Sequence, residues 1–157
     1  MEFPDIIAAL GRAVGIDIAI EDDACRLEVD DTPLTIRCIP ELRKICISAE
    51  IAEPPPERLG PLFQTLLRAN HLFQGTAGAT LSLDPETDVV CLCRCEQLDA
   101  LDEARFLSLM TEFVNTMETW AGLVVDYRPT DDSPSVDGAA ATDDGSRGLD
   151  RFGFIQV

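Results

Sequence analysis

The sequence predicts an α+β domain in which a twisted antiparallel sheet packs against three helices, in the order α-β-β-β-α-β-β-α. Three observations lead to this prediction. Several short runs alternate apolar and polar residues, which is typical of half-buried strands. Three longer segments carry apolar residues every three or four positions, which is typical of amphipathic helices. The chain has 157 residues, enough for one domain with its own hydrophobic core.

The first third of the chain is expected to form one helix and a three-stranded meander. Residues 3–14 have helical apolar spacing, Pro4 suits a first helical turn, and Gly15 favours the helix end. Three runs of period-2 alternation follow, and short turns separate them. These runs lie at residues 25–29, 34–38 and 45–51.

A break, a second helix and two further strands are expected next. Segment 53–57 ends the first part of the sheet, because consecutive prolines cannot donate to a strand ladder. The second helix is expected to begin near Pro61 and to end at the glycine-rich turn 75–78. Alternating residues then predict strands at 79–83 and 89–95.

The third helix has the clearest pattern. Asp102 is placed to cap its first turn, and apolar side chains recur every three or four residues after it. The stripe consists of Phe106, Leu109, Met110, Phe113, Val114, Met117 and Trp120. We expect this helix to help cover one side of the sheet.

The strand predicted at residues 89–95 is apolar on both faces. Val90 and Leu92 would point to one side, and Val89 and three cysteines to the other. Because the helices of one subunit can cover only one face, the other face is a candidate subunit interface.

The composition changes after Arg128. Residues 129–157 are rich in Asp, Gly, Ser, Thr and Ala, which predicts a flexible acidic tail after a folded domain of residues 1–128. The last six residues, 152–157, are mostly apolar. They are open to two interpretations, an untied terminus or a short docking segment.

The charge of the chain limits its partners. There are 29 Asp and Glu against 12 Lys and Arg, which gives a net charge of −17. Such a surface repels phosphate backbones and anionic lipid headgroups, and Lys44 is the only lysine. We therefore expect no nucleic-acid and no membrane partner. The acidity keeps the protein soluble or, in the functional interpretation, favours a protein partner with a basic segment.

A cytoplasmic location is expected. No apolar run reaches the roughly 20 residues of a membrane-spanning helix, and the first residues lack the basic region and cleavage site of a secretory signal. The six cysteines are therefore expected to be reduced, and most lie in strand-like runs where cysteine acts as a small apolar residue.

No enzyme signature is present. The only histidine, His71, lies near the end of a predicted helix, and no Gly-x-Ser-x-Gly turn accompanies it. Segment 75–78 lacks the Gly-Lys-Ser/Thr ending of a phosphate-binding loop. We expect no catalytic residue and no cofactor.

The spacing Cys91-x-Cys93-x-Cys95 is the one metal-like pattern. Side chains at i and i+2 on a regular strand lie about 7 Å apart. Three thiolates on one zinc ion, each about 2.3 Å from the metal, must lie closer together. Packed thiols are therefore the preferred interpretation, and a metal site or a redox-active thiol is the alternative.

A broader pattern covers residues 66–120. It consists of Leu66-Leu67-Arg68-Ala69-Asn70, Leu72-Phe73, Gly78, Thr80-Leu81-Ser82-Leu83-Asp84, Arg94, Leu98, Leu101-Asp102, Phe106, Leu109, Phe113, Met117-Glu118 and Trp120. This combination, in a small acidic protein, resembles the class I chaperones of bacterial type III secretion systems, the Tir-chaperone family. The three cysteines of strand 89–95 and the length of the tail depart from the family pattern.

The resemblance implies a homodimeric, ATP-independent chaperone of the bacterial cytoplasm. Such a protein binds the N-terminal region of secreted effectors, keeps that region non-globular and delivers it to the secretion apparatus. Dimerisation in the family uses the second helix and the strands after it. The candidate interface residues are Phe63, Leu66, Leu67, Val90 and Leu92.

An effector segment can add to a sheet edge through main-chain hydrogen bonds while its apolar side chains enter grooves. The first helix and the early strands supply candidate groove walls. These are Phe3, Ile6, Ile7, Leu10, Leu34, Ile36, Ile45 and Ile47. The competing interpretation is that these residues are simply core.

Two other functions stay open at this point. The chain is a candidate regulatory protein that binds a partner and couples secretion to transcription, and a secretion ATPase or a regulator is a further candidate partner. The second alternative is a thiol-based metal or redox protein that uses Cys91, Cys93 and Cys95.

Overall fold

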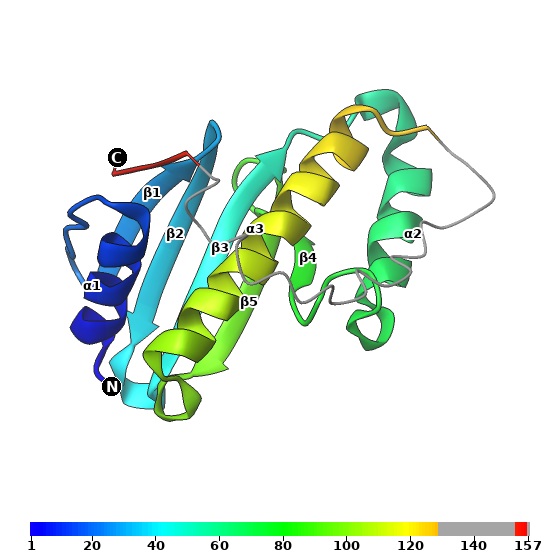
Figure 1. Ribbon diagram of the computed structural model, residues 1–157. Helices are drawn as coiled ribbons and strands as arrows, with labels where there is room; N and C mark the ends of the chain where they lie inside the picture. Colours follow the sequence, from blue (N-terminus) through cyan, green and yellow to red (C-terminus); the bar gives the residue numbers. More distant parts are fainter. Residues whose placement is uncertain (129–152, 157) are drawn as a thin grey trace, which may run out of the picture.

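The computed structural model describes residues 1–128 and 153–156, and it confirms the predicted α+β order (Figure 1). The helices are α1 (Phe3–Val14), α2 (Leu59–Asn70) and α3 (Glu103–Val125). The strands are β1 (Ala24–Val29), β2 (Thr32–Ile39), β3 (Lys44–Ala52), β4 (Thr80–Leu83), β5 (Val90–Gln97) and β6 (Phe154–Gln156). Short 3-10 turns are η1 (Pro40–Leu42), η2 (Pro56–Arg58), η3 (His71–Phe73) and η4 (Leu98–Ala100).

All six strands form one antiparallel sheet in the order β4-β5-β3-β2-β1-β6. Strands β1, β2 and β3 make the predicted meander, and β5 lies between β3 and β4. The outermost strands are therefore β4 and β6, which are four and three residues long. Strand β6 was not predicted as part of the sheet. Residues 129–152, the greater part of the predicted acidic tail, lie outside the described residues.

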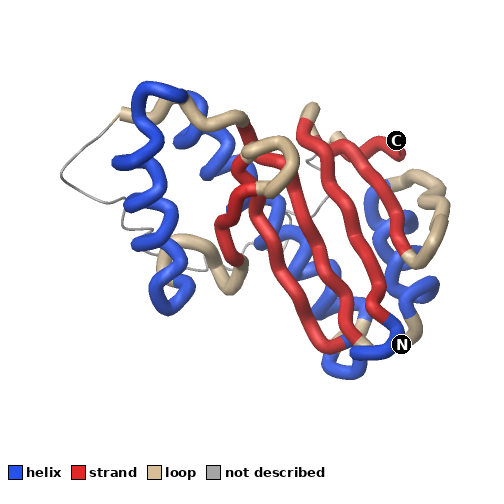
Figure 2. Tube along the Cα trace, turned by 180° about the vertical axis from the view of Figure 1, so that it is seen from behind, coloured by secondary structure: helices blue, strands red, loops and turns tan. Residues whose placement is uncertain are grey.

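Helices α1 and α3 cover one face of the sheet (Figure 1), and no described helix covers the other face (Figure 2). Helix α2 lies to the side, next to β4. The core fills the space between the sheet and the two covering helices. Its largest buried side chains come from α3, where Phe106, Phe113 and Trp120 contribute, and they share one cluster with Ile36 and Ile47 of the central strands.

Helix α3 is fixed at both ends of its buried stripe. The predicted cap is confirmed, because the Asp102 carboxylate accepts a hydrogen bond of 2.8 Å from the Arg105 backbone N–H. Near the other end, Trp120 Nε1–H donates to the Gly75 carbonyl over 2.8 Å, so this buried indole has its polar partner.

Helix α1 begins and ends at the residues that the sequence predicted. Pro4 lies in its first turn, the Glu2 N–H donates to Asp5 Oδ2 over 3.0 Å, and Gly15 takes the left-handed conformation, with φ 77°. The following segment returns close along the helix. A Cβ on Gly11 would lie 2.7 Å from the Ile16 carbonyl oxygen, so glycine permits this approach.

The junction of α2 with β4 is held by a side-chain amide. Asn70 Nδ2 donates to the Leu81 carbonyl (2.9 Å), and Asn70 Oδ1 accepts from the Leu81 N–H (2.8 Å). The N–H and the carbonyl of Leu81, on the outermost strand β4, are thereby both hydrogen-bonded. In the turn before β4, Gly78 has φ 84° and lies against the Arg94 guanidinium, which pairs with Glu112 of α3 at 2.6 Å.

Replacing Asn70 by alanine is expected to lower the free energy of unfolding by about 1–3 kcal/mol, because two part-buried main-chain groups of Leu81 lose their partner. Urea unfolding followed by circular dichroism measures the change. Gln64→Ala, on an exposed position of the same helix, is the control and should change stability by less than about 0.5 kcal/mol. Equal stability of the two variants would show that the amide does not hold β4.

Candidate functional site

The structure buries every side chain that the sequence suggested as a groove wall. Phe3, Ile6, Ile7, Leu10, Leu34, Ile36, Ile45 and Ile47 all lie in the core between the helices and the sheet. The interpretation as core is therefore the correct one for this subunit. The physical reason is that α1 and α3 lie on the same face toward which these strand residues point, so the helical stripe and the strand stripe cover each other.

The five residues suggested for a subunit interface divide into two groups. Leu67 is 70% exposed and Phe63 is half-buried, whereas Leu66 is buried against the domain. Val90 and Leu92 are fully buried, because they point to the α3 side of the sheet. These two cannot contact a second subunit, and the assignment of their face to the interface was wrong.

Exposed apolar side chains lie on α2 and on the neighbouring elements η3 and β4, and we call this set the α2 surface. Its exposed residues are Leu59, Leu67, Leu72, Phe73 and Leu83. Leu72 and Phe73 have φ of 52° and 57°, a left-handed conformation that is rare for residues other than glycine. This backbone turns both side chains outward, and Leu72 is 73% exposed.

The α2 surface is also free of acidic residues in sequence. Residues 58–83 contain two arginines and no Asp or Glu, in a chain of net charge −17. The lack of acidic residues in this stretch is visible in the sequence and could have indicated the surface, but apolar periodicity alone does not reveal it. A surface of this kind can meet a second acidic molecule with little charge repulsion.

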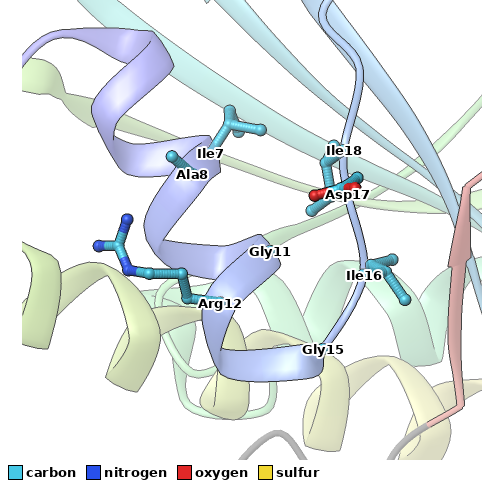
Figure 3. Close-up of a pocket in the computed structure, with 8 residues that line it drawn as sticks. All are labelled: Ile7, Ala8, Gly11, Arg12, Gly15, Ile16, Asp17 and Ile18. Atoms are coloured by element: carbon cyan, nitrogen blue, oxygen red, sulfur yellow. The ribbon is translucent and has the colours of Figure 1, made fainter.

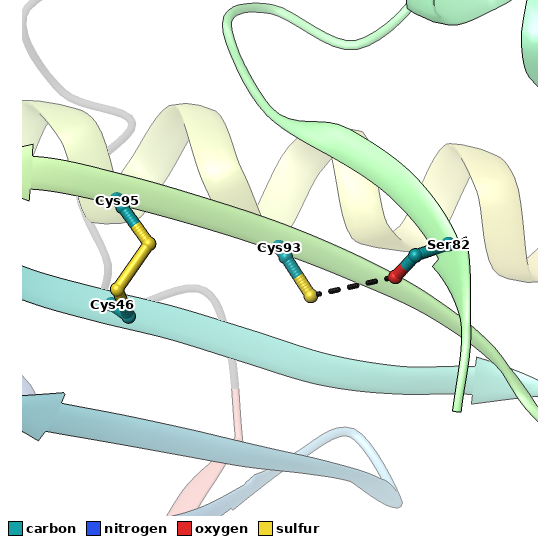
Figure 4. The surroundings of a disulfide bond; sticks show 4 residues. All are labelled: Cys46, Ser82, Cys93 and Cys95. Atoms are coloured by element: carbon teal, nitrogen blue, oxygen red, sulfur yellow. Dashed lines mark hydrogen bonds between the residues drawn. A yellow bond between two sulfur atoms is a disulfide. The ribbon is translucent and has the colours of Figure 1, made fainter. Parts of the chain in front are cut away.

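The sheet face without helices carries the cysteines. Cys91, Cys93 and Cys95 point to this face, as predicted, but Cys95 forms a disulfide with Cys46 of β3 (Figure 4). The expectation of six reduced cysteines is therefore wrong for this pair. The register places Cys46 directly opposite Cys95, with their Cα atoms 4.2 Å apart, and a sequence without known strand pairing does not reveal that position.

The remaining thiols on this face are those of Cys91 and Cys93. Burial raises the pKa of Cys91 to about 11, so its sulfur is a protonated thiol at neutral pH. Cys93 Sγ lies 3.7 Å from Ser82 Oγ (Figure 4). Among the described residues, no group of three or more His, Cys, Asp and Glu side chains is arranged to hold a metal ion.

The outer edge of β1 is a strand-binding edge, and β6 occupies part of it. The pairing is antiparallel and joins Leu27–Val29 of β1 to residues 154–156, so that Val29 lies opposite Phe154. The Asp30 N–H extends the ladder by donating to the Gly153 carbonyl over 3.1 Å. The last described residues of the chain thus complete one end of the sheet.

A pocket lies beside this edge, between α1 and the segment that follows it (Figure 3). Its volume is about 500 Å³. Ile7, Ala8 and Gly11 of α1 form one wall, and Ile16 and Ile18 form the other. Arg12 and Asp17 also line the pocket, so it offers both apolar and charged surface.

The only histidine and the long helices bear on two other kinds of function, catalysis and membrane insertion. His71 is exposed at the end of α2. Within residues 1–128 and 153–156, no helix combines the length and apolar character needed to cross a bilayer. What the fold does offer is a strand edge that binds the short segment β6, a pocket of mixed polarity between α1 and residues 16–18, and exposed apolar side chains at α2.

Comparisons with known proteins agree with this description. A model of the Tir chaperone protein (CesT) family matches residues 5–121. No curated protein matches the sequence closely enough to count.

Solved structures share the fold at low sequence identity. The ExsC–ExsE complex has a TM-score of 0.66 at 15% identity, with 76% of this chain and 91% of that chain covered. The HopA1–SchA chaperone–effector complex gives 0.60 at 17% identity, with 76% and 93% covered. The Yersinia pestis type III secretion chaperone SycH, in complex with a fragment of YscM2, gives 0.59 at 16% identity, with 75% and 98% covered.

The disulfide leads to a direct prediction. Denatured but unreduced protein should show four titratable thiols, and reduced protein six. Because the bond closes a loop of 49 residues, its reduction should cost up to roughly 4 kcal/mol of stability and lower the melting temperature. The control is the double variant Cys46→Ala, Cys95→Ala, whose melting temperature should not respond to reductant. Six thiols in the unreduced protein would show that the bond does not form.

Proposed function

This chain belongs to the Tir chaperone protein (CesT) family, and from that premise we propose that it is a type III secretion chaperone that binds an unfolded segment of an effector protein. It holds the N-terminal region of the effector in a non-globular form and delivers it to the secretion apparatus of a bacterium, from the cytoplasm. The protein acts by binding alone and is not an enzyme. The observation that carries the proposal is the outer edge of β1, which pairs with an extended segment, β6, of only three residues.

The edge of β1 is the better of the two sheet edges for an added client strand. At the other edge, the Asn70 amide already satisfies both main-chain groups of Leu81. On β1 the outward N–H of Asp30 donates to the Gly153 carbonyl of the β6 segment, and that of Glu28 points the same way in the ladder, so a client strand has to displace only this three-residue strand. Strand addition uses main-chain groups and therefore tolerates clients of different sequence.

The charge of the chaperone supports the same function. A net charge of −17 keeps a protein with exposed apolar side chains soluble and favours client segments that carry Lys or Arg. The pocket between α1 and residues 16–18 combines Ile7, Ile16 and Ile18 with Arg12 and Asp17, so it can receive apolar and polar client side chains.

The α2 surface is proposed as the contact of a homodimer. It unites exposed apolar side chains with the one long stretch of sequence that lacks acidic residues, so two copies can bury it without strong repulsion. A twofold interface buries the same patch on both subunits, so each residue adds its buried area twice and a small patch can hold two copies together. The partner copy leaves the β1 edges on the far sides of both sheets available to clients.

Client capture tests the function. The protein, expressed with an affinity tag in a bacterium that has a type III secretion system, is expected to co-purify with one or a few secreted proteins, bound through their N-terminal regions. Glu28→Pro should reduce the recovered client at least tenfold, because proline removes an outward N–H from the edge. Glu28→Ala keeps that N–H and is the matched control.

The outcome of this capture also separates the alternatives. A co-purified regulator of transcription in place of an effector would favour the coupling of secretion to gene expression. Capture that is equal for the proline and alanine variants, both shown to be folded by circular dichroism, would contradict binding at β1. Absence of any secreted protein from the purified material would contradict the chaperone function.

A charge on the α2 surface is expected to separate the dimer. Leu67→Asp places a carboxylate on an exposed apolar position, 70% exposed in the subunit, and should convert a species of twice 17.1 kDa into the monomer. Leu42→Asp is the control, because Leu42 is similarly exposed in η1, far from α2 (Figure 1). Sedimentation equilibrium measures the mass. An unchanged dimer in the Leu67 variant would exclude this surface as the interface.

A further inference from the structure

We propose that the edge of β1 is a sequence-selective peptide site and that residues Gly153–Gln156 of the chain itself are its resident ligand. The site accepts an extended segment of the form glycine, aromatic, any residue, glutamine. That a client strand uses the same site rests on the proposed function. The existence and selectivity of the site rest on the contacts of β6 alone.

The aromatic position is defined by burial. Phe154 is only 6% exposed and belongs to the hydrophobic core, in register with Val29 of β1. Strand alternation turns the next residue away, and Ile155 is 50% exposed. The edge therefore contributes an apolar receptor for one side chain and makes little demand on its neighbour.

The glycine position is defined by a close approach. The Gly153 N–H donates to Asp30 Oδ1 over 3.0 Å, and a Cβ on this residue would lie 2.9 Å from the same oxygen. A larger side chain would displace the carboxylate from its hydrogen bond. On the other side, the Gly153 carbonyl accepts from the Asp30 backbone N–H.

The glutamine position is defined by two directional hydrogen bonds. Gln156 Oε1 accepts from the Ala19 N–H (2.9 Å), and Gln156 Nε2 donates to the Arg26 carbonyl (2.8 Å). The side-chain amide thus bridges the segment after α1 and the strand β1. A carboxylate at this position would lack the donor that the Arg26 carbonyl requires.

The resident segment is short enough to be displaced. It pairs through three residues, half the length of β1, and buries a single aromatic side chain. Its hold on the edge depends on its being part of the same chain, because a tethered ligand acts at an effective concentration on the order of millimolar. A client strand with better side chains or a longer ladder replaces it, so β6 protects an otherwise open edge until a client arrives.

A peptide-binding experiment tests the site without any client. The probe is a fluorescent synthetic peptide with the sequence of residues 152–157, Phe-Gly-Phe-Ile-Gln-Val. It is titrated into a chain that ends at residue 152 and into the full chain, and binding is followed by anisotropy. The truncated chain is expected to bind the peptide at least tenfold more tightly than the full chain does.

Peptide variants test the selectivity. Changing the peptide position of Phe154 or Gln156 to alanine should weaken binding at least tenfold, whereas a change at the Ile155 position, the matched control, should alter it less than twofold. Equal binding to truncated and full chains, or no binding to either, would overturn the proposal. So would equal losses from all three alanine peptides.

Two further measurements keep the test decisive. If the truncated chain does not fold, full-length Phe154→Ala and Ile155→Ala are compared by amide hydrogen exchange. The Asp30 N–H, which donates to Gly153, should exchange faster only in the Phe154 variant. Peptide binding without client capture would leave the site intact and refute the chaperone function, while client capture without peptide binding would refute the site.

Discussion

The packing of α3 across one face of the sheet is the constraint on which the rest of the structure depends. Phe106, Phe113 and Trp120 fill the space above the central strands, and α1 closes the same layer over β1 and β2. With both helices on one side, no helix of the described residues covers the opposite face, and the strand residues that the sequence suggested for client binding are part of the core. Any binding function is thereby moved from the sheet face to its edges and to α2.

The main-chain groups at the two ends of the sheet are hydrogen-bonded in different ways. At β4 a single amide, that of Asn70, satisfies the outward groups of Leu81, the second residue of this four-residue strand. At β1 the cover is a segment from the far end of the chain, held by three ladder positions, one aromatic side chain and the Gln156 amide. An edge that is covered by so small an element is protected from aggregation and still accessible to a longer strand, as a holder of unfolded segments requires.

Charge and apolar surface are also divided between different parts of the molecule. The acidic residues keep the molecule soluble, and they are absent from residues 58–83, where Leu67, Leu72 and Phe73 are exposed. The surface proposed for self-association, at α2, and the edge proposed for client binding, at β1, therefore lie at opposite ends of the sheet. The Cys46–Cys95 bond ties β3 to β5 between these two ends, on the face that the helices leave open.

The sequence by itself determined the element order, the caps of α1 and α3 and the family resemblance, because caps and apolar periods are local and each is written within a few residues, as in Pro4, Gly15 and Asp102. Only the tertiary structure decided which apolar residues are buried, which cysteines meet and where the chain end goes. Val90 became core and Leu67 surface, although both are apolar in regular elements, because burial depends on which face α3 covers. Cys46 and Cys95, or Phe154 and Val29, are joined by strand register over long separations, and register follows from the packing of the whole sheet.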